Sequence, residues 1–241
     1  MGKSLVVRFT TLPLLAFRPP SVQLSAMRVR VIEQELLEIY PEDHPDAICG
    51  REDLLLVNAV MGNHRWMERM LRRWHQPGWR ITEIGAGDGA LSLRLKEQGI
   101  CAAKDLHAFD LAARPARWPS EAAWTQGDFF QHPLPESEVL MANLILHHFR
   151  DEQLRVLGSR ISSKTRLILA AEPARRRIHS WMGRFFSWLA ELNHITAYDM
   201  QVSIRAGFRG DEMRVALGLG EEWQVSVQMH PLGGYRFMAW R

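Results

Sequence analysis

The sequence predicts an α/β fold built on a doubly wound, largely parallel sheet, and three observations support this prediction. Short apolar runs alternate with longer segments of helical periodicity between residues 77 and 171, as in consecutive βαβ units. A glycine-rich segment joins the first of these runs to a helix. The last two apolar runs are joined by Pro231-Leu-Gly-Gly234, which is typical of a β-hairpin, so we expect an antiparallel strand at the end of the sheet.

The start of the chain differs in composition from the rest. The first 32 of the 241 residues contain no Asp or Glu but carry five basic residues. Arg8 and Pro13 interrupt what would be the apolar core of a secretory signal. We therefore expect residues 1–28 to form a basic, poorly ordered extension, with Met27 as an alternative start. No apolar run approaches the roughly 20 residues that a membrane-spanning helix needs.

Residues 29–76 form the predicted N-terminal helical segment. The proline-flanked stretch 41–45 ends its first helix, Glu52–Met61 is a second, apolar-rich helix, and Asn63 is the predicted N-cap of a third. One face of the third helix is rich in arginine and the other is apolar, which predicts that the apolar face packs on the core. The apolar face consists of Trp66, Met67, Met70, Leu71 and Trp74.

The remaining chain supplies the strands of the sheet. Apolar runs without helical periodicity are typical of parallel strands that are buried on both faces. Between them, Leu91–Gln98 and Asp151–Ile161 have helical periodicity. We expect strands at Arg80–Ile84, Ala103–Phe109, Ala122–Thr125, Val139–Leu144, Leu167–Ala171, Trp223–Gln228 and Tyr235–Trp240.

The strongest local motif is Ile81-Thr-Glu-Ile-Gly-Ala-Gly-Asp-Gly-Ala-Leu91. Its glycines allow a tight turn and a close approach of the backbone to a ligand at the start of a helix. The spacing is G-x-G-x-G rather than the G-x-G-x-x-G of many dinucleotide sites. Glu83 would repel a phosphate beside this loop, but its carboxylate suits a ligand that carries an ammonium group.

Two further acidic residues follow predicted strands. Asp110 ends the second strand, where a carboxylate can accept hydrogen bonds from both hydroxyls of a ribose. Asp128 follows the third strand and can accept from an exocyclic amine, while Phe129 can lie against a purine face. Carboxylates for an ammonium, a ribose and an adenine amine, in this order, describe S-adenosylmethionine better than NAD.

With these motifs the chain resembles the class I S-adenosylmethionine-dependent methyltransferases from about Glu52 to Arg241. The segment Asn143-Leu-Ile-Leu-His147-His148-Phe149 resembles the segment after strand 4 of the small-molecule members, and two further segments resemble a bacterial secondary-metabolism subgroup. The resemblance implies a Rossmann-like, seven-stranded sheet of order 3-2-1-4-5-7-6 with strand 7 antiparallel. It implies a cofactor-binding domain at residues 77–241 with a lid at 174–200. The implied cofactor-binding residues are Glu83, Gly85, Ala86, Gly87, Asp88, Gly89, Asp110, Leu111, Asp128, Phe129 and Asn143.

The histidine pair is the best-placed titratable group for catalysis. His147 and His148 follow the fourth strand, and open parallel sheets bind their ligands at the carboxyl ends of the strands. Either imidazole could remove the proton of an acceptor hydroxyl during in-line methyl transfer. The alternatives are that the histidines orient or pack against neighbours, or that no base is used. Glu172 alone does not make a magnesium site, so we expect no metal.

Candidate acceptor-binding residues lie in the predicted lid and the third helix. Trp181 and Phe185 fall at helical spacing with Trp188, a pattern that indicates either core packing or an aromatic pocket. Trp66 of the third helix would add a further aromatic side chain to such a pocket. Arg205 is the predicted polar contact. The alternative is that Asp199 and Arg205 pair with each other or cap a helix.

We therefore expect a methyltransferase for a small, largely apolar or aromatic metabolite, acting on oxygen. The alternatives are C-methylation, methylation of RNA or protein, an NAD(P)-dependent oxidoreductase, and a non-catalytic binding module. The segment after the fourth strand lacks the [DNS]-P-P-[YF] motif of many N-methyltransferases.

The expected setting is a monomer or homodimer in the cytoplasm, without a nucleic-acid partner. Two cysteines, Cys49 and Cys101, make no disulfide framework. From residue 33 onward the chain has 25 basic and 27 acidic residues, so its net charge of +3 comes from the leading segment and does not indicate nucleic-acid binding.

Overall fold

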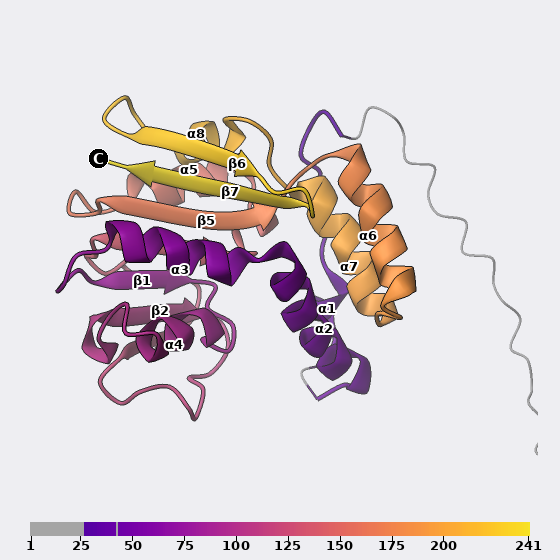
Figure 1. Ribbon diagram of the computed structural model, residues 1–241, viewed down its shortest axis with the longest axis horizontal. Helices are drawn as coiled ribbons and strands as arrows, with labels where there is room; N and C mark the ends of the chain where they lie inside the picture. The colour runs from indigo at the N-terminus through magenta and orange to yellow at the C-terminus, as the bar shows by residue number, and fades with distance from the viewer. Residues whose placement is uncertain (1–26, 42) are drawn as a thin grey trace, which may run out of the picture.

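A computed structural model of the protein describes residues 27–41 and 43–241 (Figure 1). Most of the extension expected at residues 1–28 lies outside the described residues. A seven-stranded sheet of order β3-β2-β1-β4-β5-β7-β6 forms the centre of the fold, and this confirms the predicted topology. The strands are β1 (Ile81–Ile84), β2 (Leu106–Asp110), β3 (Ala123–Gln126), β4 (Val139–Asn143), β5 (Leu167–Pro173), β6 (Gln224–Met229) and β7 (Gly234–Trp240).

The inner strands are apolar because both faces of the sheet are covered. All residues of β1 and β5 are buried. The pairs β1–β2, β1–β4, β2–β3 and β4–β5 are parallel, whereas β7 runs antiparallel to both β5 and β6. The antiparallel direction follows from the turn between β6 and β7, where Gly233 has φ +91°. The parallel strands therefore present their carboxyl ends at one edge of the sheet.

Helices cover the two faces of the sheet. On one face, α5 (Asp151–Ser159) and α8 (Glu212–Leu217) pack against each other and the sheet. On the other face, α3 (Asn63–Trp74) and α4 (Ala90–Glu97) complete a second core. The buried residues of α3 include Trp66, Met67 and Leu71, which confirms the predicted apolar face of this helix.

The predicted capping role of Asn63 is wrong. Gly62 precedes α3 with φ +63° and forms its N-cap, so Asn63 already belongs to the first helical turn. The side chain of Asn63 points into the interior, and neither of its polar atoms has a partner among the described residues. The left-handed Gly62 ends α2 and starts α3 in a single residue, which leaves no separate capping position.

Four helices gather beyond the carboxyl ends of the parallel strands, at the right of Figure 1. They are α1 (Leu36–Ile39), α2 (Pro45–Met61), α6 (Arg177–Leu189) and α7 (His194–Ala206). The helix α7 contacts the other three. The N-terminal helical segment is thus divided, because α3 packs on the sheet while α1 and α2 join this helical group. Within the described part of the chain, no helix is both long and apolar enough to cross a membrane.

Candidate active site

A cavity of about 970 Å³ lies between the carboxyl ends of the strands and the helical group. Its strand side consists of the loops after β1, β2 and β4 together with Pro173 of β5, and its helical side consists of residues from α1, α2, α6 and α7. Open parallel sheets place their ligand sites at this edge. The cavity brings seven of the predicted cofactor residues together: Glu83, Gly85, Ala86, Gly87, Asp88, Asp110 and Asn143.

The glycine-rich loop turns sharply out of β1. Gly85 has φ +65°, and a Cβ atom at this position would lie 2.5 Å from the side chain of Ile145. Gly87 has φ +58°, and no other atom lies within 4 Å of where its Cβ would be. The backbone of the loop is therefore accessible from the cavity at Gly87, while Gly85 packs tightly on the β4 loop.

Asp110 connects the loops after β1 and β2. Its carboxylate accepts hydrogen bonds from the backbone N–H of Gly87 at 2.6 Å and of Ala112 at 2.8 Å. Each carboxylate oxygen keeps a second lone pair for a ligand. Burial raises the pKa of Asp110, although the backbone N–H groups oppose this shift. Asp110 thus holds the loop in place and still offers two acceptors to the cavity.

Glu83 places a buried carboxylate next to this loop. Ser92 of α4 donates a hydrogen bond to it. Burial raises the pKa of Glu83 to about 7 despite this hydrogen bond. A cationic ligand group in the cavity would favour the ionised form of Glu83.

Four of the predicted cofactor residues do not line the cavity: Gly89, Leu111, Asp128 and Phe129. Asp128 accepts from the backbone N–H of Phe130 at 2.8 Å and closes a local turn. Phe129 is buried, and its ring packs against those of Phe130 and Phe149. The sequence placed this pair correctly after the third strand, but the aromatic cluster turns Phe129 into the core rather than toward the cavity.

The histidine pair lies in a 3-10 turn directly after β4. Nδ1 of His147 donates to the Glu172 carboxylate at 2.6 Å. Glu172, which is fully buried in β5, also accepts from the backbone N–H groups of Ile145, Leu146 and His147 at 3.1, 2.9 and 3.3 Å. This carboxylate therefore fixes both the turn and the orientation of the His147 ring.

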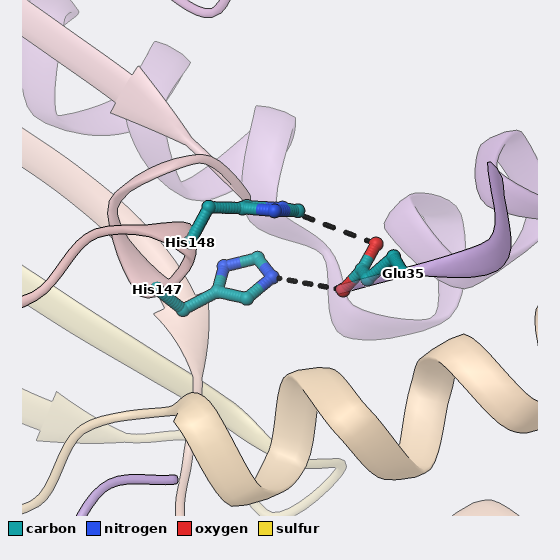
Figure 2. A group of neighbouring side chains, drawn as sticks. All are labelled: Glu35, His147 and His148. Atoms are coloured by element: carbon teal, nitrogen blue, oxygen red, sulfur yellow. Dashed lines mark hydrogen bonds and ion pairs between the residues drawn. The ribbon is translucent and has the colours of Figure 1, made fainter. Parts of the chain in front are cut away.

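A second carboxylate reaches the histidines from the N-terminal side (Figure 2). Glu35 lies immediately before α1, and its two oxygens lie 3.4 Å from Nε2 of His147 and 3.9 Å from Nε2 of His148. Burial alone would lower the pKa of His147, but hydrogen bonds with Glu172 and Glu35 raise it to about 9. Sequence reasoning missed Glu35 because it lies 112 residues before His147 in no recognisable motif.

The segment around Glu35, residues 30–38, is held by α7, and we call it the N-terminal arm. Asp199 accepts from the backbone N–H groups of Leu36 at 2.7 Å and Leu37 at 3.0 Å. Arg205 pairs with Glu33 at 2.7 Å and does not line the cavity. The predicted role of Arg205 in acceptor binding is therefore not supported, and the alternative pairing of Arg205 with Asp199 is wrong, because both side chains bind the arm. The other alternative, a helix cap, describes Asp199, which accepts from the first two backbone N–H groups of α1.

The predicted aromatic pocket faces the wrong way. Trp181 and Phe185 are 71% and 61% exposed, and Trp66 is buried in the core between α3 and the sheet. The opposite face of α6, with Met182, Gly183 and Phe186, lines the cavity instead. Gly183 allows α6 to approach α7 closely, because a Cβ there would lie 3.0 Å from Sδ of Met200. The face of α6 that packs against α7 is therefore the one that carries Gly183, and not the one that carries Trp181 and Phe185.

Comparison with known proteins connects this architecture to a fold family. No family model matches the chain, and no curated protein matches its sequence. Among solved structures, the pyocyanin biosynthetic protein PhzM aligns with a TM-score of 0.57 and 15% identity, over 86% of this chain and 62% of PhzM. Human N-acetylserotonin methyltransferase in complex with SAM aligns with a TM-score of 0.54 and 18% identity, over 90% of this chain and 64% of the human protein.

A third structure matches over almost its whole length. The plantazolicin methyltransferase BpumL, in complex with a triazolic desmethylPZN analog and SAH, aligns with a TM-score of 0.63 and 10% identity over 85% of this chain and 93% of BpumL. The chain spans less than two thirds of PhzM and of the human enzyme. At these identities the comparisons establish the fold, which this chain shares with these solved structures.

Proposed function

We propose that the protein is an S-adenosylmethionine-dependent methyltransferase that acts on oxygen of a small, largely apolar or aromatic metabolite. One observation carries this proposal: a single cavity joins the glycine-rich loop and Asp110 to the Glu172–His147 pair. The two similar methyltransferase structures described above contain SAM or SAH. These ligands support the choice of cofactor, while the acceptor is inferred from the cavity.

The cavity has polar groups that suit this cofactor. Within residues 27–41 and 43–241 no cation pairs with the buried carboxylate of Glu83, and this carboxylate would bind the ammonium group of the methionine moiety. Asp110 would accept hydrogen bonds from the ribose hydroxyls. Beyond Asp110, Ala112 and Pro115 line the cavity and offer an apolar surface to the purine, the role that the sequence assigned to Phe129. When bound, S-adenosylmethionine supplies a sulfonium-activated methyl group.

The helical side of the cavity is suited to an apolar acceptor. Val57 and Val60 of α2, Met182 and Phe186 of α6, and Met200 of α7 line it. A volume of about 970 Å³ is at the upper end for small-molecule sites, so it can hold a cofactor and a small acceptor together. These walls would exclude water from the reacting atoms and align the acceptor for in-line attack.

The charge of the cavity disfavours RNA as the acceptor. A nucleic-acid methyltransferase would need basic residues around the strand ends. Among the described residues that line the cavity, carboxylates outnumber the single Arg51: they are Glu35, Glu38, Glu52, Glu83, Asp88, Asp110 and Asp199.

His147 is the group that would take the acceptor proton. Glu172 holds its Nδ1–H, so Nε2 faces Glu35 and the cavity. Glu172 and Glu35 raise the pKa of His147 to about 9, so the ring must first lose its Nε2 proton. An acceptor hydroxyl that replaces the Glu35 oxygen removes one of these two carboxylates. It would then donate its proton to the neutral Nε2, and Glu172 would stabilise the imidazolium that forms. His148 lies beside it, with ring centroids 4.2 Å apart. A base at this position suits O-methylation, because a hydroxyl must lose its proton as it is methylated.

A methyl-transfer screen tests this proposal. The full chain is incubated with S-adenosylmethionine labelled in the methyl group and with panels of phenols, other hydroxylated aromatic compounds, RNA and protein. We expect label in a hydroxylated small molecule, and none when His147 is replaced by Gln. Label that enters only RNA or protein would overturn the acceptor class, and label on carbon would overturn the assignment to O-methylation.

A further inference from the structure

We propose that Glu35, His147 and His148 form a binding site for a divalent transition-metal ion of the zinc class. The three side chains come from the N-terminal arm and the turn after β4, and they converge on one point of the cavity wall (Figure 2). Their ligand atoms, one oxygen and two ring nitrogens, all lie within 4.8 Å of one another. We define them as the Glu35–His147–His148 cluster.

The spacing of the cluster fits one small ion. Zinc bonds of about 2.0–2.1 Å in a tetrahedral arrangement place neighbouring ligand atoms roughly 3.4 Å apart. Oε1 of Glu35 lies 3.4 Å from Nε2 of His147, and Oε2 of Glu35 lies 3.9 Å from Nε2 of His148. Because the three ligand atoms lie within 4.8 Å of one another, the side chains would close around the ion by roughly an ångström at most to reach this spacing.

The partners of the two imidazoles leave both Nε2 atoms directed at Glu35. Nδ1 of His147 lies 2.6 Å from Glu172, and Nδ1 of His148 lies 2.8 Å from Glu38. A carboxylate on the far nitrogen fixes the tautomer of a metal-binding histidine and increases the basicity of the nitrogen that binds the metal. The third member of the cluster, Glu35, is held by Ser203, whose hydroxyl donates a hydrogen bond to the Glu35 carboxylate.

The charges around the cluster also favour a cation. Three carboxylates, Glu35, Glu38 and Glu172, surround the two imidazoles, and only Glu38 is substantially exposed. A divalent ion would offset this excess of negative charge. Two imidazoles and one carboxylate suit zinc-class ions, whereas magnesium and calcium prefer oxygen ligands alone. The remaining coordination position would face the cavity.

The consequence for catalysis rests on the proposed function. An ion bound to Nε2 of His147 occupies the lone pair that would accept the acceptor proton. Zn²⁺ should therefore inhibit methyl transfer at concentrations that follow its dissociation constant. The expectation of no metal came from considering only Glu172, which holds His147 rather than the ion. Glu35 changes this interpretation because it adds a carboxylate on the open side of both rings.

Metal titration of the full chain tests the site without any methyl acceptor. Zn²⁺ is followed by calorimetry and Co²⁺ by its visible absorption, and we expect one ion per chain. Replacing a ligand, as in Glu35→Gln or His148→Asn, should weaken binding by about 100-fold or more. Glu38→Gln should weaken it by roughly 10- to 100-fold. His64→Asn, a cavity histidine outside the cluster, should bind the ion like the wild type.

Two results would overturn the site: no saturable binding of either ion, or binding that Glu35→Gln and His148→Asn leave unchanged. A Co²⁺ spectrum with a thiolate charge-transfer band would also overturn it, because the ion would then sit on a cysteine such as the exposed Cys49. Melting curves verify that each variant is folded. A parallel titration with S-adenosylhomocysteine separates the two proposals. If the chain binds Zn²⁺ but not S-adenosylhomocysteine, the proposed function is contradicted while the metal site stands.

Discussion

The two sides of the cavity are built in different ways. On the strand side, Glu83 lies in β1, Gly87 in the loop after it and Asp110 at the end of β2, and the backbone N–H of Gly87 donates to the Asp110 carboxylate across only 23 residues. On the helical side, the N-terminal arm and α7 meet through side chains far apart in the sequence, such as Glu35 and Ser203, which are separated by 168 residues. The first side is fixed by the sheet, whereas the second depends on a few polar contacts. Cofactor binding and acceptor chemistry should therefore respond separately to substitutions.

Among substitutions that affect only one side of the cavity, the largest effect should come from His147. Replacing His147 by Gln removes the proposed base but leaves the glycine-rich loop intact. Loss of general base catalysis should reduce kcat by about 10²- to 10⁴-fold, while the affinity for S-adenosylhomocysteine stays the same. Kinetic assays with an acceptor found in the screen, together with calorimetry, measure both quantities. An equal loss of kcat and of affinity for S-adenosylhomocysteine would show that the strand side and the helical side of the cavity are coupled.

Asp110 should give the opposite pattern. In Asp110→Ala the loop loses the acceptor of Gly87 N–H, and the proposed partner of the ribose hydroxyls is removed. Hydrogen bonds to charged groups are worth about 1.5–3 kcal/mol each, so we expect the affinity for S-adenosylhomocysteine to fall by about 100-fold. Asp128→Ala is the matched control, because Asp128 lies outside the cavity and should leave the affinity unchanged. A larger effect of Asp128→Ala would restore its predicted role.

Gly85 tests the rigidity of the strand side. In Gly85→Ala the new Cβ meets Ile145 at a backbone conformation with positive φ. Strain of this kind costs about 1–3 kcal/mol, which denaturant unfolding would detect as lower stability. Gly78→Ala has a positive φ of +86° without any atom within 4 Å, so it should be less destabilising. Equal losses would mean that contact with Ile145 is unimportant.

The pH dependence of cofactor binding should report on Glu83. The ligand ammonium favours the ionised carboxylate, and the pKa of Glu83 in the free protein is about 7. Affinity should therefore rise by up to about tenfold between pH 6 and pH 8 and then level off. Titration calorimetry at several pH values measures this. In Glu83→Gln the affinity should be lower and nearly independent of pH; an unchanged profile would place the ammonium elsewhere.

The smallest effect should come from the N-terminal arm. Arg205→Ala removes the pair with Glu33, which is partly exposed and worth about 0.2–1 kcal/mol. We expect the KM of the acceptor to rise only a few-fold, while the affinity for S-adenosylhomocysteine is unaffected. Arg176→Ala, an exposed arginine just before α6, is the control. A loss of cofactor affinity in Arg205→Ala would contradict the separation of the two sides.

The same contrast explains how far the sequence could predict the site. The positions of the strands, the hairpin and the loop residues up to Asp110 follow from local patterns, because each strand end is read from a short apolar run. The order of the strands in the sheet follows only from the resemblance to methyltransferases. Glu35 could not be predicted in this way, since its position depends on how the arm packs against α7. Helical spacing identified an aromatic face of α6 but could not say whether that face points inward. In the fold, the close approach of α6 to α7 at Gly183 determines which face of α6 points inward.

Binding of S-adenosylhomocysteine tests the central claim most directly. Calorimetric titration of the full chain, of its Asp110→Ala variant, and of the full chain with NADPH requires no knowledge of the acceptor. We expect one saturable S-adenosylhomocysteine site per chain, strongly weakened in Asp110→Ala, and no saturable binding of NADPH. Saturable NADPH binding without S-adenosylhomocysteine binding would contradict the assignment of the cavity to methyl transfer.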